Sequence, residues 1–286
     1  MLFTPAKINI GLKIIGKRDD GYHNLETIFY PVKLYDEVEV SVERSSKNTN
    51  SLLLHSDSRI VPNDKSNVCY KAVVAFFRIF GIRDYYVIKI NVNKKIPVGG
   101  GLGGGSSDAA SVLKFLINYF KIDININKKK VIEIALLVGS DVPFFLVQKP
   151  CFASGRGESM KILIDFNLNA YKILLINPNL HISTKWAFEA LGLEPGEARK
   201  SELSSVTRFD LSNLEVLVND FESVVFEKYD FLGRIKEELR DFGAVFSSLS
   251  GSGATMYGIF HRSSADDIKK ALNFYKSKAF LTHISD

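Results

Sequence analysis

Gly99-Gly-Gly-Leu-Gly-Gly-Gly105 runs directly into Ser106-Ser-Asp108, so a loop almost free of side chains leads into a polar segment. Glycine lets backbone N–H groups approach phosphate oxygens without a Cβ in the way, and a helix start adds unpaired donors and a positive dipole end. Residues 86–92 before the loop have the pattern of a strand, and apolar residues over 107–120 recur at helical spacing. The sequence therefore predicts a strand, a glycine loop and a helix in that order, an arrangement that can bind a polyphosphate.

Three other kinds of glycine loop fit less well. Gly99, Gly101 and Gly104 satisfy the G-x-G-x-x-G pattern of dinucleotide sites, but residues 125–130 are polar and basic where an acidic ribose ligand is needed. A Walker loop ends in Gly-Lys-Ser/Thr, whereas Gly105 is followed by serine. A flexible linker is not enclosed between an apolar strand and an apolar-faced helix.

Length and composition indicate a globular protein of two domains. The chain has 286 residues, of which 46% are hydrophobic and 24% charged. The net charge of +5 comes from scattered lysines with short clusters at residues 94–95 and 128–130. No basic and aromatic residues alternate as in single-strand binders, so we expect no nucleic-acid partner. The charge would instead assist capture of an anionic nucleotide.

Cysteine content and hydropathy predict a cytoplasmic location. Cys69 and Cys151 are too few for a disulfide framework or a set of zinc ligands, and we expect reduced, buried thiols. The first residues lack a basic segment followed by an apolar core. No uncharged run approaches the roughly 18 residues of a membrane span, so no membrane association is expected.

Apolar periodicity predicts mixed strands and helices. Strands are expected over residues 7–15, 25–32, 36–42, 51–55, 86–92, 171–176, 244–249 and 255–260. Helices are expected over residues 67–80, 107–120, 129–138, 214–226, 232–242 and 266–276. Residues 193–205 contain Pro195 and Gly196 and are expected to form a loop. Because strands and helices do not strictly alternate, an α+β class is favoured over a doubly wound sheet.

Further motifs accompany the glycine loop in a family-specific order. They are Pro5-Ala-Lys-Ile-Asn-Ile-Gly-Leu12, Asp20-Gly-Tyr-His23, Gly139-Ser-Asp-Val-Pro-Phe-Phe145, Ser154-Gly-Arg-Gly-Glu158 and Ser250-Gly-Ser-Gly-Ala-Thr255. Together they resemble the GHMP kinases, named for the galactose, homoserine, mevalonate and phosphomevalonate kinases. The resemblance implies a ribosomal-S5-like ATP-binding domain over residues 1–160 and a ferredoxin-like domain over 161–286, in a monomer or homodimer.

The resemblance implies catalytic roles for Lys7 and Asp141. Period-two alternation places Lys7 and Asn9 on one polar face of the first strand, although a lysine in a strand is usually only a surface charge. Asp141 precedes Val142-Pro143, where an aspartate often only caps a helix. In the family's motif it would instead accept the proton of the substrate hydroxyl, while Lys7 orients the carboxylate and offsets negative charge.

The same resemblance implies sites for ATP and Mg²⁺. The residues expected to bind ATP are Asn67, Lys95, Pro97, Val98, Gly99, Gly100, Gly101, Leu102, Gly103, Gly104, Gly105, Ser106 and Ser107. Ser106 or Ser107 would contact a phosphate or the Mg²⁺ that bridges it. Asp108 is expected either to cap the helix or to contact the metal indirectly, with capping favoured, and the two serines could also be capping residues. Asn67 and Lys95 could also be ordinary surface residues.

A cytidyl diphosphate sugar alcohol is the substrate that the resemblance implies. Asp20–His23 could be only a turn, but in the family Tyr22 would stack on the cytosine and His23 would hydrogen-bond to it. Asn9 and Thr184 would help to seat the substrate, with Phe188 as a second aromatic wall. Gly251–Gly253 forms a second tight turn with either a structural or a substrate-binding role, and Trp186 could be a core residue.

Two other functions are compatible with parts of this pattern. Another GHMP kinase, of the homoserine or mevalonate type, would need no residues to recognise a base. A non-catalytic binding protein of the same fold would not need both Lys7 and Asp141. The sequence therefore favours an ATP-dependent small-molecule kinase.

Overall fold

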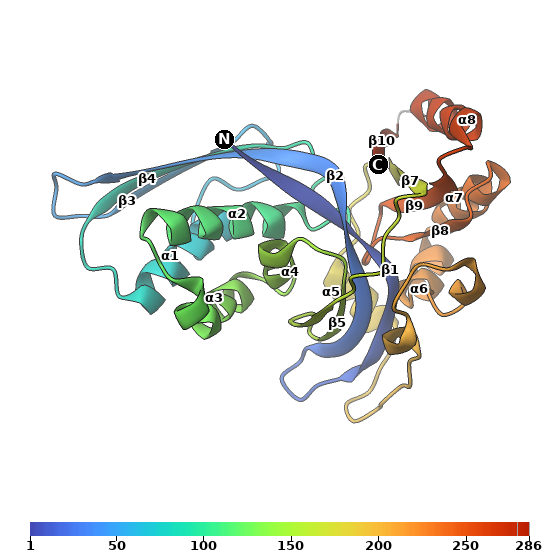
Figure 1. Ribbon diagram of the computed structural model, residues 1–286, viewed down its shortest axis with the longest axis horizontal. Coiled ribbons are helices and arrows are strands. Elements are labelled where there is room, and N and C mark those ends of the chain that lie inside the picture. The colour runs from blue at the N-terminus through green and yellow to red at the C-terminus, as the bar shows by residue number, and fades with distance from the viewer. Residues whose placement is uncertain (279, 286) are drawn as a thin grey trace. The chain divides into compact units, whose positions relative to one another are not determined.

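The computed structural model describes residues 1–278 and 280–285 (Figure 1). The strands are β1 (Leu2–Lys17), β2 (His23–Arg44), β3 (Ser51–Ser56), β4 (Tyr86–Asn93), β5 (Cys151–Gly155), β6 (Ser159–Ile162), β7 (Tyr171–Asn177), β8 (Phe246–Leu249), β9 (Met256–His261) and β10 (Leu281–Ser285). The α-helices are α1 (Val68–Phe80), α2 (Gly104–Tyr119), α3 (Ile124–Val138), α4 (Val142–Val147), α5 (Thr184–Ala190), α6 (Phe221–Lys228), α7 (Asp230–Asp241) and α8 (Ala265–Ser277). Short 3₁₀ helices occupy Leu203–Ser205 and Leu211–Asn213.

The chain forms two compact units that are not consecutive halves of the sequence. The first unit comprises Met1–Ala6, Leu34–Val98 and Gly103–Gln148, and the second comprises Lys7–Lys33, Gly99–Leu102 and Lys149–Asp286. Strands β1 and β2 and the glycine loop thus each contribute residues to both units. The α+β class is confirmed, while the expected domain boundary at residue 160 stays a prediction.

The first unit combines strands with helices α1 to α4. Strand β3 is parallel to β4, and β4 pairs antiparallel with the second part of β2, from Glu37↔Asn93 to Arg44↔Tyr86. Helix α1 packs on α2 and α3, and α4 also packs on α2. Asn67 begins α1, because its side chain accepts a 2.8 Å hydrogen bond from the Cys69 N–H and replaces a missing intrahelical partner.

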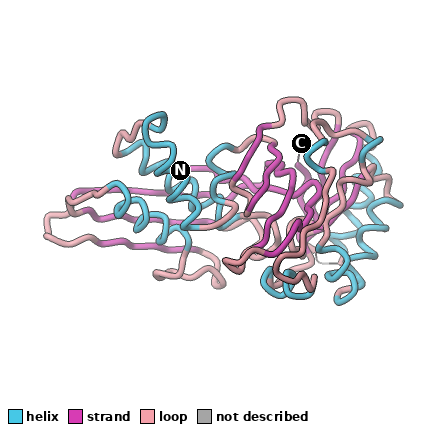
Figure 2. Tube along the Cα trace, turned by 90° about the horizontal axis from the view of Figure 1, so that it is seen from below, coloured by secondary structure: helices cyan, strands magenta, loops and turns pink. Residues whose placement is uncertain are grey.

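The second unit contains an antiparallel sheet in the order β10-β7-β9-β8. Helix α7 packs on β8 and β9, and α8 packs on β7 and β10. The helices of this unit lie beside its strands (Figure 2). The first part of β2 pairs antiparallel with β5, and β5 pairs with β6.

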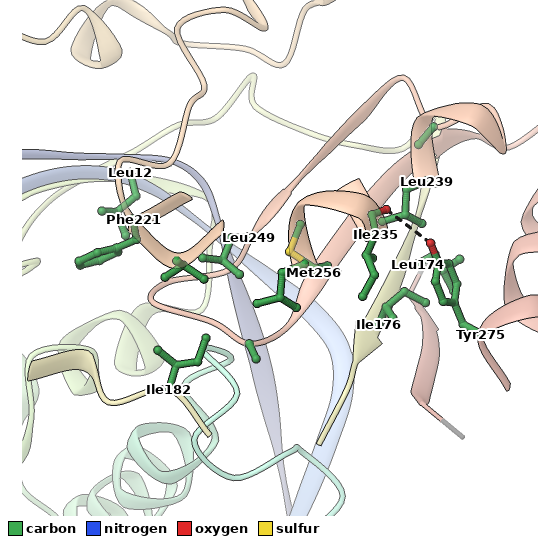
Figure 3. Packing of buried hydrophobic residues seen from close by; sticks show 14 of the residues in the cluster. Leu12, Leu174, Ile176, Ile182, Phe221, Ile235, Leu239, Leu249, Met256 and Tyr275 are labelled. Carbon is green, nitrogen blue, oxygen red and sulfur yellow. Dashed lines mark hydrogen bonds between the residues drawn. The ribbon is translucent and has the colours of Figure 1, made fainter. Parts of the chain in front are cut away.

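Apolar side chains from the sheet and helices form the core of the second unit (Figure 3). Leu174 and Ile176 of β7 are fully buried, as are Leu239 of α7 and Met256 of β9. Burying one such side chain contributes roughly 1.5–3 kcal/mol. The phenolic oxygen of the buried Tyr275 of α8 lies 3.0 Å from the Glu238 carboxylate and 3.4 Å from the Ile235 carbonyl, both of α7, and it donates its one proton to the nearer carboxylate.

The predicted helix over residues 214–226 is wrong in its first part, because α6 begins only at Phe221. Residues just before α6 pair with β1 instead: Leu12 N–H donates to the Val218 carbonyl, and Asp220 N–H donates to the Leu12 carbonyl. A helix cannot form where its backbone groups are already committed to another strand.

Helix α2 begins at Gly104, and the predicted capping by Ser106, Ser107 or Asp108 is wrong. Its N-cap is Gly103, which provides no side-chain hydrogen bond. The predicted strands over residues 25–32 and 36–42 are one continuous strand, β2. Helix α3 begins five residues before its predicted start, because Asp123 accepts a hydrogen bond from Asn125 N–H there.

Several short elements were not predicted from the sequence: strands β5, β6 and β10, and helices α4 and α5. Each has few residues, so its periodicity is weak. Within residues 1–278 and 280–285, no helix has both the length and the apolar character needed to cross a membrane.

Candidate active site

The expected site residues fall in both compact units, and the second unit holds the first part of the glycine loop. Gly99 and Gly101 have φ of +71° and +78°. A Cβ on Gly101 would collide with the Ser250 carbonyl oxygen, and a Cβ on Gly99 would collide with the His181 ring. Backbone conformation and space both require glycine at these two positions.

Lys7 and Asn9 lie beside this part of the loop. As their spacing in β1 predicts, they contact each other: Lys7 Nζ donates to Asn9 Oδ1 at 2.6 Å and to the Gly101 carbonyl at 3.1 Å. Both residues are buried, with exposures of 3% and 2%. A buried ammonium is stable only when it is hydrogen-bonded or paired, and these acceptors meet that need. Lys7 is thus not a surface charge.

The second glycine turn contacts the first. Ser250 Oγ donates to the Gly101 carbonyl at 2.9 Å, so this carbonyl accepts bonds from both Ser250 and Lys7. Asn219 Nδ2 donates to the carbonyls of Leu249 and Gly251, each at 2.8 Å, and so also holds the turn. Thr184 and Ser252 share a 2.8 Å hydrogen bond between hydroxyls. The turn therefore has a structural role at least.

Asp20 shapes the segment that carries the expected base-binding residues. Its carboxylate accepts from the Arg18 guanidinium and, at 3.1 Å, from Tyr22 N–H. The Arg156 guanidinium lies 3.7 Å from the centre of the Tyr22 ring, and the Tyr22 residue is 49% exposed. A cation over one ring face holds the ring while part of it faces solvent. A base could stack on such a ring.

His23 stacks on Phe188, with ring centres 4.3 Å apart and planes 12° from parallel. Burial and, to a smaller extent, the charge of Lys17 lower the pKa of His23. The imidazole is therefore neutral at pH 7, with one nitrogen that donates and one that accepts hydrogen bonds. Trp186 is half-buried and packs against the core, which agrees with the prediction that it could be a core residue.

The first unit holds the rest of the glycine loop and the start of α2. Gly103 has φ +71°, and the first turn of α2 contains Ser106 and Ser107. The first N–H groups of a helix have no partner within it and suit an anion. Ser107 Oγ is buried with no hydrogen-bond partner in the described chain. Such a hydroxyl fits a role as ligand to a phosphate or a divalent cation.

Asp141 is the N-cap residue of α4, but its carboxylate makes no capping hydrogen bond to that helix. Pro143 lies in the first turn, where the missing N–H needs no partner. Asp141 therefore does not have the purely capping role that its sequence position allowed.

Asn67 and Lys95 have structural contacts in the first unit. Asn67 caps α1, and its Nδ2 donates to the Pro62 carbonyl at 2.7 Å. Lys95 pairs with Glu37, and its side chain is 52% exposed. Pro97 and the exposed Val98 follow in the segment that leads to the loop.

A buried charge network, which sequence reasoning missed, supports this segment. Asp36 accepts from the backbone N–H of Lys95 and Ile96 at 2.6 and 2.7 Å, and its carboxylate pairs with Lys94. Lys94 Nζ also donates to Asp108 Oδ2 at 2.8 Å. Burial first, and then the Asp36 charge, raises the pKa of Asp108 to about 6. No sequence pattern links residues so far apart in the chain.

Within the described residues, no group of three or more His, Cys, Asp or Glu side chains could hold a metal ion. Within the first unit, Gly103 leads into the start of α2, where Ser107 has a buried hydroxyl with no hydrogen-bond partner among the described residues. A helix start of this kind after a glycine loop suits a phosphate group, as in enzymes that take a nucleotide as phosphoryl donor.

Family comparisons agree with this class. Residues 67–149 match the GHMP kinases N terminal domain, and residues 203–278 match the GHMP kinases C terminal domain. The chain therefore belongs to the GHMP kinase family and is an ATP-dependent small-molecule kinase.

Sequence similarity to curated relatives extends over most of the chain. The "4-diphosphocytidyl-2-C-methyl-D-erythritol kinase" of Bacteroides thetaiotaomicron is 39% identical over 90% of this chain and 91% of its own length. The protein of the same name from Chlorobium luteolum is 38% identical over 93% and 90%.

Solved structures show the same fold. A crystal structure of 4-(cytidine 5'-diphospho)-2C-methyl-D-erythritol kinase has a TM-score of 0.75 at 26% identity and covers 99% of this chain and 97% of its own. Homoserine kinase from Cytophaga hutchinsonii has a TM-score of 0.67 at 17% identity, with 99% and 93% covered. At that identity the likeness concerns the fold alone.

Proposed function

We propose that this protein transfers the γ-phosphoryl group of ATP to the 2-hydroxyl of 4-diphosphocytidyl-2-C-methyl-D-erythritol, in the methylerythritol phosphate route to isoprenoid precursors. The observation that carries the proposal is the shared name of relatives that are 35–39% identical over about 90% of the chain. Tyr22 and His23 support it, because an exposed aromatic face and a neutral imidazole suit a pyrimidine base.

Asp141 would accept the proton of the attacking hydroxyl. A carboxylate is too weak a base to ionise an alcohol in advance, so the proton would move late, in a loose transition state with charge spread over the transferred phosphoryl oxygens. Lys7 would offset that charge with an ammonium already held by Asn9 and Gly101. Positioning and charge stabilisation would therefore supply most of the rate acceleration.

The glycine loop would bind the phosphates of ATP through its backbone N–H groups. Ser106 or Ser107 would provide a hydroxyl ligand to Mg²⁺, and Ser107 is supported by its hydroxyl, which has no hydrogen-bond partner among the described residues. When bound, Mg²⁺ supplies positive charge that neutralises the phosphate oxygens. Asn67, Lys95, Pro97 and Val98 are proposed to contact the nucleotide.

The substrate would be seated by residues of the second unit: Tyr22 against the cytosine, His23 at its polar edge, and Asn9 and Thr184 nearer the alcohol. Phe188 would support the His23 ring on which it already stacks, besides forming an aromatic wall. The cytoplasm is the proposed location.

Turnover of ATP by the purified protein, with Mg²⁺, tests the proposal. The cytidyl diphosphate substrate is compared with homoserine and mevalonate, and ADP release is followed. Turnover confined to the first substrate supports the proposal. Turnover of another alcohol would retain the kinase but refute the substrate. ATP binding without turnover of any substrate would favour a non-catalytic binding protein.

Asp141→Asn tests the proposed base, because general-base catalysis contributes about 10²- to 10⁴-fold in rate. Asp123→Asn, at the N-cap of α3, is the matched control and should leave kcat unchanged. Near-wild-type turnover by Asp141→Asn would contradict the assignment.

A further inference from the structure

We infer that Thr27 is a positioning residue that holds Asn9 and, through it, the ammonium of Lys7; the inference rests on the proposed function. Thr27 belongs to β2. It is part of neither the glycine loop nor the charged motifs of the sequence. Its side-chain oxygen lies 2.9 Å from Asn9 Nδ2 and 2.7 Å from the Gly11 carbonyl oxygen. All of these residues belong to the second unit.

The direction of each hydrogen bond follows from chemistry. A lysine ammonium only donates, so the Asn9 atom 2.6 Å from Lys7 Nζ must be the amide oxygen. The Asn9 NH₂ group then faces Thr27, whose oxygen accepts from it. The Thr27 proton is consequently donated to the Gly11 carbonyl, which can only accept.

This chain of bonds permits one orientation of the Asn9 amide. A flipped amide would place its NH₂ group against the Lys7 ammonium, two donors facing each other. Thr27 is fully buried and Asn9 is 2% exposed, so bulk water does not replace a lost partner. A buried polar group left without a partner loses its hydrogen bond to water and gains none in the protein, so it is destabilising. The Thr27 hydroxyl therefore selects the orientation that presents an acceptor to Lys7.

The far end of the chain of bonds, at Gly11, is closely packed. Gly11 has φ +76°, and a Cβ there would lie 2.9 Å from Leu203 Cδ1 and 3.2 Å from Leu217 Cα, so packing surrounds this glycine closely. Thr27 itself pairs with Ala153 of β5. Thr27 thus links the backbones of β1 and β2 to the side chain of Asn9, which in turn holds Lys7.

Thr27→Val tests the inference, because valine keeps the volume and branching of threonine but lacks the hydroxyl. We expect a kcat at least fivefold lower and a raised KM for the alcohol substrate, since Asn9 is proposed to contact it. KM for ATP should stay within twofold. Thr27→Ser, which retains the hydroxyl, should recover most of the lost kcat. Ser247→Ala controls for the loss of a buried hydroxyl, because Ser247 donates to Lys236 O in the same unit.

Kinetics are measured with whichever of the three alcohols the wild-type protein phosphorylates, so an error in the proposed substrate appears in the wild type and not in the variants. Equal losses in Thr27→Val and Thr27→Ser, or wild-type kcat in Thr27→Val, would overturn the inference. Crystal structures of both variants give a readout that does not require turnover. An unchanged Asn9 amide and unchanged Lys7–Gly101 contact in Thr27→Val would also overturn it, and Thr27→Ala, which likewise lacks the hydroxyl, serves if the valine variant does not fold.

Discussion

The ammonium of Lys7 lies 3.1 Å from the carbonyl oxygen of Gly101, so the buried lysine of β1 is hydrogen-bonded directly to the glycine loop. The same carbonyl accepts from Ser250 Oγ at 2.9 Å. The backbone conformation of Gly101 thus sets the position of the carbonyl oxygen that Lys7 Nζ and Ser250 Oγ both contact. This relationship explains why a small change in the loop should affect the proposed chemistry.

Gly101→Ala should reduce turnover at least 100-fold, because its Cβ would collide with the backbone of the second glycine turn. Gly192→Ala is the matched control: its φ is +65°, but nothing lies within 4 Å of the added Cβ. Left-handed backbone alone costs about 1 kcal/mol, so the control should lose a little stability and retain its kcat. Steady-state kinetics and thermal unfolding of both variants provide the comparison, and equal effects would contradict the collision.

Asp108→Asn should change how stability depends on pH. The pKa of Asp108 is raised to about 6 by burial and by Asp36, so the folded state binds this proton more tightly than the unfolded chain. The stability due to this group is therefore fully present below about pH 4 and is lost as the pH rises through 6, by roughly 3 kcal/mol in total. The variant should lack this loss.

Urea unfolding of wild type and Asp108→Asn between pH 4 and 7.5 measures this effect. The difference between the two proteins reports the titration of Asp108 together with that of its neighbour Asp36, since carboxyl groups outside this network contribute equally to both. Relative to wild type, the variant should gain stability as the pH rises. A difference that does not vary with pH would show that the proton is bound elsewhere.

Tyr22→Ala should raise KM for the cytidyl substrate about tenfold and leave KM for ATP unchanged, because stacking on an aromatic ring contributes about 0.5–1.5 kcal/mol. Tyr22→Phe keeps the ring face over Arg156 and should retain most of the affinity. Tyr85→Ala, a similarly exposed tyrosine at 43%, is the control. A parallel rise in both KM values for Tyr22→Ala would argue against cytosine recognition.

Glu222→Ala should destabilise the second unit by about 3 kcal/mol. The buried carboxylate accepts from Ser248 Oγ at 2.7 Å and Leu249 N–H at 2.9 Å, and it pairs with Lys236. Removing it leaves several buried donors without an acceptor. Denaturant unfolding measures the loss. Glu237→Ala on the exposed side of α7 should change stability by less than about 0.5 kcal/mol.

Local patterns predicted much of the structure correctly. The alternation in β1 placed Lys7 and Asn9 on one face, and the glycine run predicted the junction between β4 and α2. Helices with a clear apolar period, such as α1, α7 and α8, were found within two residues of their predicted ends. Period and conformational freedom are properties of neighbouring residues, so they are present in the chain before it folds.

Long-range contacts decided the rest. Residues 218–220 pair with β1 and so do not extend α6, although their own pattern favoured a helix. The partners of Asp36, of Asp108 and of Thr27 come from distant segments, and no spacing rule connects them. The residue pattern was thus sufficient to predict the family, the phosphate loop and most of the helices and strands. The folded structure was needed to show which buried donors and acceptors meet, because each buried polar group is satisfied by a partner that only tertiary packing brings within hydrogen-bond distance.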